Sequence, residues 1–174
     1  NKGQAMYHFL SGYTAKVAGT EAGINEPQPV FSACFGAPFL PLHPTTYAEM
    51  LGKKMDEHQV NVWLINTGWT GGPYGIGHRI DLKYTRATIQ AALRGELNDV
   101  GYETNHVFGL AMPQSCPNVP SGILNPRQTW DDPDAYDQKA QTLASYFNDN
   151  FETYADFASQ EIRDAAPVVT TASS

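Results

Sequence analysis

An apolar run followed at once by a glycine-rich segment is the strongest constraint that this sequence places on its fold. The run, residues 60–65 (VNVWLI), lacks the clean alternation of a strand with one wet face, so it predicts a strand covered on both faces in an α/β sheet. The segment after it, residues 66–80 (NTGWTGGPYGIGHRI), has five glycines in fifteen residues. Ligands of open α/β sheets bind beyond the carboxyl ends of strands, which makes this loop the first candidate for a binding site.

Two helices are predicted before this strand. The first has apolar residues at helical spacing, namely Met6, Phe9, Leu10, Tyr13 and Val17. The second begins with Pro44 as its first helical residue, and Thr46 and Glu49 are spaced as a capping box. The residues that this second helix is expected to turn toward the core are Tyr47, Met50, Leu51 and Met55.

Two further helices are predicted after the glycine loop. Thr85 is placed to cap the third helix and Gly95 to end it, with Ile89, Ala92 and Leu93 on its apolar side. The fourth helix begins at about Asp134. It carries a stripe of residues expected to pack in the core, namely Tyr136, Ala140, Leu143, Phe147, Asn150, Phe151 and Tyr154.

Short strands are expected at residues 30–42, at residues 79–84 and just before a Pro-punctuated loop at residues 113–130. Together with residues 60–65 they predict an α/β fold with a mixed sheet and flanking helices. No linker divides the sequence into two domains, so residues 1–166 are expected to form one folded segment. The small, polar end, residues 167–174, is expected to be a disordered tail.

The charge balance excludes several classes of function. The 11 basic and 18 acidic residues give a net charge of −7, which argues against binding to nucleic acid or to anionic membranes. No apolar run approaches the roughly 20 residues that span a bilayer, and no signal peptide is recognisable, which favours the cytoplasm. Cys34 and Cys116 lie far apart and are read as reduced packing residues.

The glycine loop can hold a polar ligand, although it matches no phosphate-binding motif. Arg79 supplies a fork of donors, and Thr85 could offer its hydroxyl to a polar ligand edge. The sequence contains no GxxxxGK[ST], and the loop leads into a predicted strand, whereas a dinucleotide fingerprint opens a helix. The five histidines have no metal-site spacing, and His78 beside Arg79 is the one of most interest.

Five segments together resemble one family. They are residues 7–21 (YHFLSGYTAKVAGTE), 31–51 (FSACFGAPFLPLHPTTYAEML), 62–72 (VWLINTGWTGG), 79–93 (RIDLKYTRATIQAAL) and 124–130 (LNPRQTW). In this order, over nearly all of residues 1–165, they resemble the C-terminal part of the ATP-dependent phosphoenolpyruvate carboxykinases. The start without a methionine, inside an expected helix, agrees with a fragment truncated at its N-terminus.

The resemblance implies the C-terminal segment of a larger two-domain carboxykinase fold that contains a P-loop. Its members convert oxaloacetate and ATP to phosphoenolpyruvate, CO₂ and ADP with a divalent metal ion, Mg²⁺ or Mn²⁺. By the same resemblance Arg79, Ile80 and Thr85 contact ATP, and Phe39 is positioned for the same end of the nucleotide. The family's P-loop, metal ligands and oxaloacetate-binding arginines have no counterpart in this sequence, so no catalytic or metal-binding residue is assigned. The chain by itself is expected to be inactive.

A second hypothesis stands beside the enzyme fragment. The chain could be a free-standing α/β module whose glycine loop holds a nucleotide or a small anion without chemistry. The two hypotheses differ in what precedes Asn1, because a P-loop after a strand would be expected only in the enzyme.

Overall fold

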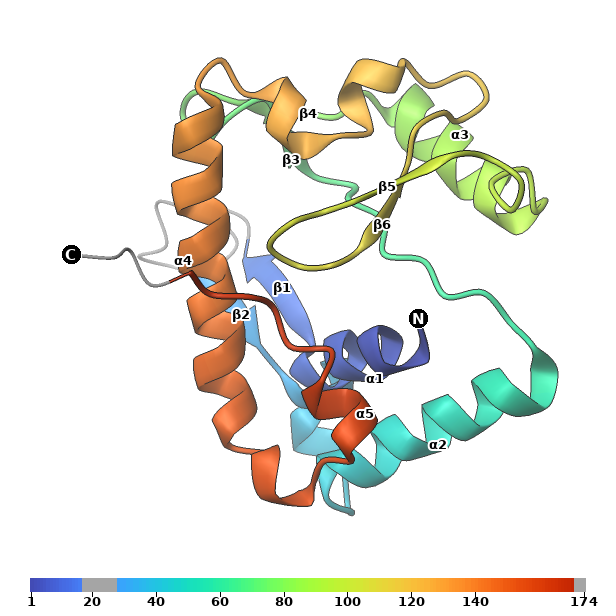
Figure 1. Cartoon of the computed structure of the whole chain (residues 1–174), viewed down its shortest axis with the longest axis vertical. Coiled ribbons are helices and arrows are strands. Elements are labelled where there is room, and N and C mark those ends of the chain that lie inside the picture. Colours follow the sequence, from blue (N-terminus) through green and yellow to red (C-terminus); the bar gives the residue numbers. More distant parts are fainter. Residues whose placement is uncertain (17–27, 171–174) are drawn as a thin grey trace. The chain divides into compact units, whose positions relative to one another are not determined.

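The computed structural model describes residues 1–16 and 28–170 (Figure 1). The chain divides into two compact units. The first unit holds residues 1–62 and 143–174, and the second unit holds residues 63–142. Within the described ranges helices combine with small antiparallel sheets of two strands each, which confirms the predicted α/β character and resolves the expected mixed sheet into separate pairs.

In the first unit, helix α1 (Lys2–Ser11) is fixed at both ends by its own sequence. Asn1 forms a capping box, in which its Oδ1 accepts a hydrogen bond from the Gln4 amide at 2.9 Å and its amino group donates to Gln4 Oε1 at 2.8 Å. Gly12 ends the helix in the left-handed conformation, with φ 56°. A Cβ at Gly12 would collide with the carbonyl oxygen of Ser32, so glycine is required there.

The chain leaves α1 earlier than the sequence predicted. The expected helix through residue 17 is wrong beyond Ser11, because Gly12 turns the chain into strand β1 (Tyr13–Lys16). Val17, the last residue of that prediction, lies outside the described residues. Strand β1 pairs with β2 (Gln28–Phe31) in an antiparallel register that places Tyr13 opposite Phe31.

The strand predicted at residues 30–42 is also mostly wrong. Strand β2 ends at Phe31, and two 3₁₀ turns follow, η1 (Ala33–Phe35) and η2 (Ala37–Phe39). Cys34 and Phe35 both have positive φ, 51° and 59°, which an extended strand does not allow.

Helix α2 (Pro44–His58) begins at the predicted proline, but its cap differs from the prediction. His43 is the N-cap, and its Nδ1 accepts a hydrogen bond from the Thr45 amide at 3.4 Å. The predicted capping box of Thr46 and Glu49 is therefore wrong, because the helix has already begun two residues before Thr46. Its buried residues are Thr45, Ala48 and Gly52, whereas Met50 is exposed and Tyr47, Leu51 and Met55 are half-buried.

The core of the first unit forms where α1 meets α2 and the C-terminal part of α4 (Pro133–Glu152). Met6, Tyr7 and Leu10 of α1 are buried, and a Cβ at Gly52 of α2 would collide with the Met6 sulfur. The Tyr7 ring packs on that of Phe151 at 4.8 Å between centroids. The stripe predicted for the fourth helix is confirmed as far as Phe151, because Ala140, Phe147 and Phe151 are buried and Tyr136, Leu143 and Asn150 are half-buried. Tyr154 is half-buried too, but it lies beyond the end of α4.

After α4, the chain forms the 3₁₀ turn η5 (Ala155–Phe157) and the short helix α5 (Gln160–Arg163), whose Ile162 is buried. Pro167 is buried as well, and its carbonyl accepts a hydrogen bond from Asn148 Nδ2 at 3.2 Å. The tail predicted for residues 167–174 thus begins with a packed residue. Its last part, residues 171–174, lies outside the described residues.

The second unit is built around helix α3 (Leu82–Leu93). Its small core consists of Ala91, Leu97 and Cys116, with Trp63, Ala92, Val119 and Leu124 packed against it. Strands β5 (Tyr102–Thr104) and β6 (Ala111–Pro113) form a hairpin beyond this core. Burial raises the pKa of the Cys116 thiol, in agreement with a reduced packing residue.

Residues 60–65 do not form the strand that their composition predicted. They belong to neither a helix nor a strand, and the exposed fractions of Val60, Val62 and Leu64 are 50%, 43% and 56%. In the described part of the chain, the backbone groups of residues 62–65 form no hydrogen bond with other backbone groups. A strand requires a neighbour for its ladder, and here it has none.

The strand predicted at residues 79–84 is wrong beyond its first residue. Of this segment, only Arg79 belongs to a strand, β4 (His78–Arg79), and helix α3 already begins at Leu82. Asp81 occupies the N-cap position of α3, although its side chain forms no cap hydrogen bond. The prediction that Thr85 caps the helix is therefore also wrong, because Thr85 lies one turn inside it.

Candidate functional site

The glycine-rich loop folds as a narrow hairpin in the second unit. Strand β3 (Trp69–Thr70) pairs with β4 in an antiparallel register. Trp69 lies opposite Arg79, and Thr70 lies opposite His78. Because paired residues of an antiparallel ladder project from the same face, the side chains of Trp69 and Arg79 share one face of the hairpin.

Hydrogen bonds fix the base of this hairpin. The Asn66 amide side chain donates to the Trp69 carbonyl at 3.0 Å and accepts from the Gly68 amide at 2.9 Å. The Ile80 amide donates to the Gly68 carbonyl at 2.9 Å and so closes the two arms. The backbone of Trp69 is therefore held by the Asn66 side chain, and that of Ile80 by the Gly68 carbonyl.

A further contact joins the hairpin to the 3₁₀ turn η4 (Pro126–Thr129). The Gly71 amide donates to Thr129 Oγ1 at 3.3 Å, and that hydroxyl donates to the Pro126 carbonyl at 2.7 Å. Gly71 has φ 78°, and a Cβ there would lie 3.1 Å from the His78 ring. The glycine thus permits both the turn and the approach of the imidazole.

Arg79 is exposed at the end of β4, as expected for a residue available to a ligand. Its guanidinium forms neither a hydrogen bond nor an ion pair with any described residue. All five donors of the fork are therefore open to an anion, a carbonyl or the edge of a ring. In this respect Arg79 differs from Arg127, whose Nε and Nη2 donate hydrogen bonds to Asp137.

The structure places Ile80 and Thr85 in the same unit as Arg79. Ile80 is half-buried directly after β4, and Thr85 is 9% exposed in the first turns of α3. Between them, Lys83 forms an ion pair with Asp81 at 3.3 Å, and the hydrogen bond to Asp81 raises the pKa of Lys83. Near the start of α3, the positive charge of Lys83 is thus already paired.

Phe39 is part of the first unit. It ends the turn η2 and is 87% exposed, the highest exposed fraction among the exposed large hydrophobic residues. Its position is inconsistent with a core residue. Arg79, Ile80 and Thr85 belong to the second unit.

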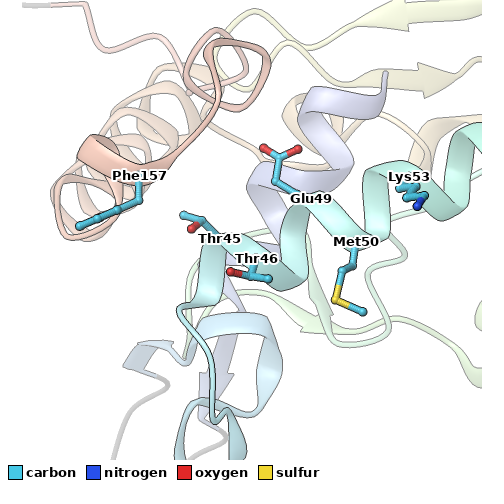
Figure 2. A pocket seen from close by; sticks show the side chains of 6 residues that line it. All are labelled: Thr45, Thr46, Glu49, Met50, Lys53 and Phe157. Carbon is cyan, nitrogen blue, oxygen red and sulfur yellow. The ribbon is translucent and has the colours of Figure 1, made fainter.

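A pocket that the sequence did not indicate lies on α2 (Figure 2). Five residues of α2 and Phe157 of η5 line it: Thr45, Thr46, Glu49, Met50, Lys53 and Phe157. Lys53 pairs at 3.8 Å with Glu57 one turn further along the helix, and Phe157 packs its ring on His43 at 4.6 Å. The lining contains no nucleophile and base in contact, so the pocket shows no catalytic arrangement.

The described residues contain neither a cluster of metal ligands nor a membrane-spanning helix. In residues 1–16 and 28–170, no group of three or more His, Cys, Asp or Glu side chains could hold a metal ion. The same ranges contain no helix that combines the length and apolar character needed to cross a membrane.

Comparisons with known proteins give a consistent result. Residues 1–122 match the family model described as phosphoenolpyruvate carboxykinase. The chain is 68% identical over 166 residues to the phosphoenolpyruvate carboxykinase (ATP) of Flavobacterium johnsoniae, and 63% identical over 166 residues to that of Christiangramia forsetii. Both alignments cover 95% of this chain and 31% of the relative.

A third relative extends the same pattern. The phosphoenolpyruvate carboxykinase (ATP) of Brevibacillus brevis is 58% identical over 169 residues, which cover 97% of this chain and 32% of that protein. The chain therefore spans about a third of the length of these relatives, and a model of the family matches well over half of it. On these grounds the chain belongs to the phosphoenolpyruvate carboxykinase family.

Proposed function

We propose that this chain supplies the nucleotide-base side of an enzyme that converts oxaloacetate and ATP to phosphoenolpyruvate, CO₂ and ADP, as in gluconeogenesis. The relatives are named phosphoenolpyruvate carboxykinase (ATP), and their identity to this chain reaches 68%. The observation that carries the proposal is the unpaired guanidinium of Arg79, held at the end of β4 beside Ile80. High identity to these enzymes favours this function over a free-standing binding module.

Each proposed contact suits a different part of a nucleotide. Arg79 can donate to an anionic or carbonyl oxygen or stack on a ring, and the half-buried Ile80 can cover the apolar face of a base. Thr85 can hydrogen-bond a polar edge. Phe39 is retained as a fourth, separate contact, because an 87% exposed phenyl ring is available to stack on a base.

Catalysis requires more than the described residues provide. Phosphoryl transfer depends on cradled phosphates and on a metal ion that neutralises developing charge. The described residues contain no group of three or more His, Cys, Asp or Glu side chains that could hold Mg²⁺ or Mn²⁺, so they do not fit the metal ion that this reaction needs. We propose that the phosphate and metal sites lie in the part of the carboxykinase length that this chain does not span, and that the enzyme works in the cytoplasm.

Arg79→Ala tests the nucleotide site in a carboxykinase of full family length that carries this sequence. Loss of a charge-assisted contact should weaken ATP binding by roughly 10-fold to 150-fold and leave oxaloacetate binding nearly unchanged. Arg79→Lys should recover only part of the affinity, because lysine lacks the planar fork.

Arg94→Ala is a matched control from the same unit. Arg94 is similarly exposed and its nearest acidic partner, Glu96, is 3.8 Å away, so ATP affinity should not change. Calorimetric titration with ATP, accompanied by a thermal melt of each variant, decides the question. Equal ATP affinities in wild type, Arg79→Ala and Arg79→Lys would remove Arg79 from the site.

A further inference from the structure

The three tryptophans of the second unit have different surroundings. Trp63 packs against the core of Ala91, Leu97 and Cys116, and its ring stacks on Tyr102. Trp130 contacts the edge of Tyr136 at 5.7 Å between centroids. Trp69 instead lies in the glycine hairpin, opposite Arg79, and keeps 37% of its surface exposed.

The hairpin holds the Trp69 ring in a defined place. The ring packs against Tyr74 with centroids 5.9 Å apart and planes tilted by 36°. A Cβ at Gly77 would lie 2.8 Å from the indole nitrogen, so the glycine leaves room for the ring. Tyr74 and Gly77 therefore both help to hold the exposed indole of Trp69 in place.

From this geometry we propose that Trp69 is a further nucleotide-binding residue, which stacks on the base of ATP beside Arg79. The inference rests on the proposed function of Arg79. An indole and a guanidinium on the same face of a two-residue ladder form an aromatic surface next to a fork of donors. A purine offers a π-face to the indole, and its polar edge or phosphates can meet the guanidinium.

Two other apolar side chains of the hairpin, Tyr74 and Ile76, are exposed as well. Tyr74 is 48% exposed and Ile76 is 72% exposed, although the hairpin consists mainly of polar and glycine residues. Tyr74 supports the indole from the tip side, whereas Ile76 is not part of that ring contact. Tyr74 thus acts as a positioning residue through Trp69, and Ile76 serves as a control position in the same loop.

The first test compares ATP with inorganic tripolyphosphate in the full-length carboxykinase that carries this sequence. Trp69→Ala should weaken ATP binding by about 5-fold to 150-fold, the range expected for loss of one base–aromatic stack. Tripolyphosphate has no base, so its affinity should stay unchanged. Trp69→Phe should keep most of the ATP affinity, and Ile76→Ala should change neither ligand by more than about 2-fold.

The second test uses ¹⁹F NMR on protein that keeps Trp69. The full-length protein is labelled with 5-fluorotryptophan, and the ¹⁹F resonance of Trp69 is assigned by its loss in Trp69→Phe. Saturating ADP should shift this resonance by more than it shifts those of Trp63 and Trp130. This measurement stays valid if Trp69→Ala fails to fold.

The outcomes separate this inference from the proposed function. If Arg79→Ala weakens ATP binding while Trp69→Ala has no effect and the Trp69 resonance stays in place, Trp69 is only a packing residue and the inference fails. If neither substitution affects ATP binding, the proposed nucleotide site itself is wrong. Equal weakening of ATP and tripolyphosphate by Trp69→Ala would show a structural role and would also overturn the inference.

Discussion

Arg127 holds Asp137 by a forked pair of hydrogen bonds within the second unit. Arg127 Nε donates to Asp137 Oδ1 at 3.0 Å, and Nη2 donates to Oδ2 at 3.0 Å. His106 Nε2 lies 3.4 Å from the same carboxylate. The guanidinium lowers the pKa of Asp137, and His106 adds to this effect when it is charged. The pair links η4 to the first turns of α4. The same turn η4 carries Thr129, whose hydroxyl contacts the hairpin at Gly71.

We predict that Asp137→Asn lowers the melting temperature by no more than about 3 °C, because the pair is partly exposed to water. The folded-state pKa of Asp137 lies below 3.8, so the contribution of this pair is complete above that pH and is lost as the pH falls through the lowered pKa. Arg127→Lys should lose a similar amount, since lysine cannot form the fork. Melting curves at pH 7 and pH 3 measure this, and a loss that is larger at pH 3 than at pH 7 would contradict it.

Burial of His8 predicts acid sensitivity of the first unit. Its Nε2 is buried without a hydrogen-bond partner in the described part of the chain, its ring packs against Phe147, and burial lowers its pKa from 6.5 to about 4. The unfolded chain therefore binds more protons at this site between pH 4 and pH 6.5. Stability should be complete above pH 6.5 and fall by up to about 3 kcal/mol as the pH drops toward 4.

His8→Leu tests this prediction, because it removes the titration while keeping an apolar side chain of similar size. Unfolding by denaturant at pH 7 and pH 4.5 should show a smaller difference for His8→Leu than for wild type. His58→Gln is the matched control at an exposed histidine and should keep the full difference. The same pH difference in wild type and His8→Leu would assign the acid sensitivity to other groups.

The segments that the sequence predicted correctly are those stabilised by local interactions. The fourth helix shows its periodicity from Ala140 to Phe151 in contacts that lie three and four residues apart, and the helix forms as predicted. The start of α2 at Pro44 is equally local, because proline fixes its own φ. Likewise, the predicted glycine loop forms because Gly71, Gly72 and Gly75 permit its turns.

The absence of a strand at residues 60–65 could not be predicted, because strand pairing is not local. The valines and Leu64 of this segment favour an extended chain, but a ladder needs a partner strand, and the described residues supply none. Thr85 shows a different limit. Both Asp81 and Thr85 are suitable caps, and the sequence does not reveal that the helix begins after Asp81 and buries Thr85 in its first turns. The pairing of Trp69 with Arg79 depends on hairpin register, which the long glycine loop leaves open.

Substitutions of Gly75 and Gly77 in the hairpin should have different effects, because one introduces backbone strain and the other a steric collision. A Cβ at Gly77 would collide with backbone oxygens and approach the Trp69 indole, whereas Gly75 has φ 90° and a Cβ there would meet no atom within 4 Å. We predict that Gly75→Ala costs about 1 to 2 kcal/mol of stability through strain and leaves ATP binding unchanged. Gly77→Ala should displace the indole and weaken ATP binding in the full-length enzyme by at least about 5-fold. Equal ATP affinities for the two variants would show that the indole position does not matter.

Helix α3 presents an apolar face outward. Leu82, Ile89 and Leu93 recur at helical spacing, and their exposed fractions are 60%, 37% and 83%. Of the residues predicted on the apolar side of this helix, Ala92 packs against the core, whereas Ile89 and Leu93 are exposed. Soluble monomers rarely leave large contiguous apolar patches uncovered, and this chain spans only 31% of the length of its relatives.

We therefore predict that the 174-residue chain, prepared by itself, binds the dye 8-anilinonaphthalene-1-sulfonate, whereas a full-length carboxykinase carrying the same sequence does not. Replacing Leu82 and Leu93 together by lysine should reduce the fluorescence of the bound dye, because charged side chains remove apolar surface from the outer face of α3. Gln90→Lys, at an exposed polar position of the same helix, controls for added charge and should leave the fluorescence unchanged. The chain by itself should also form no phosphoenolpyruvate from oxaloacetate and ATP, since phosphate and metal sites are required. A sharp melt without dye binding, or measurable product, would show that the chain is self-sufficient.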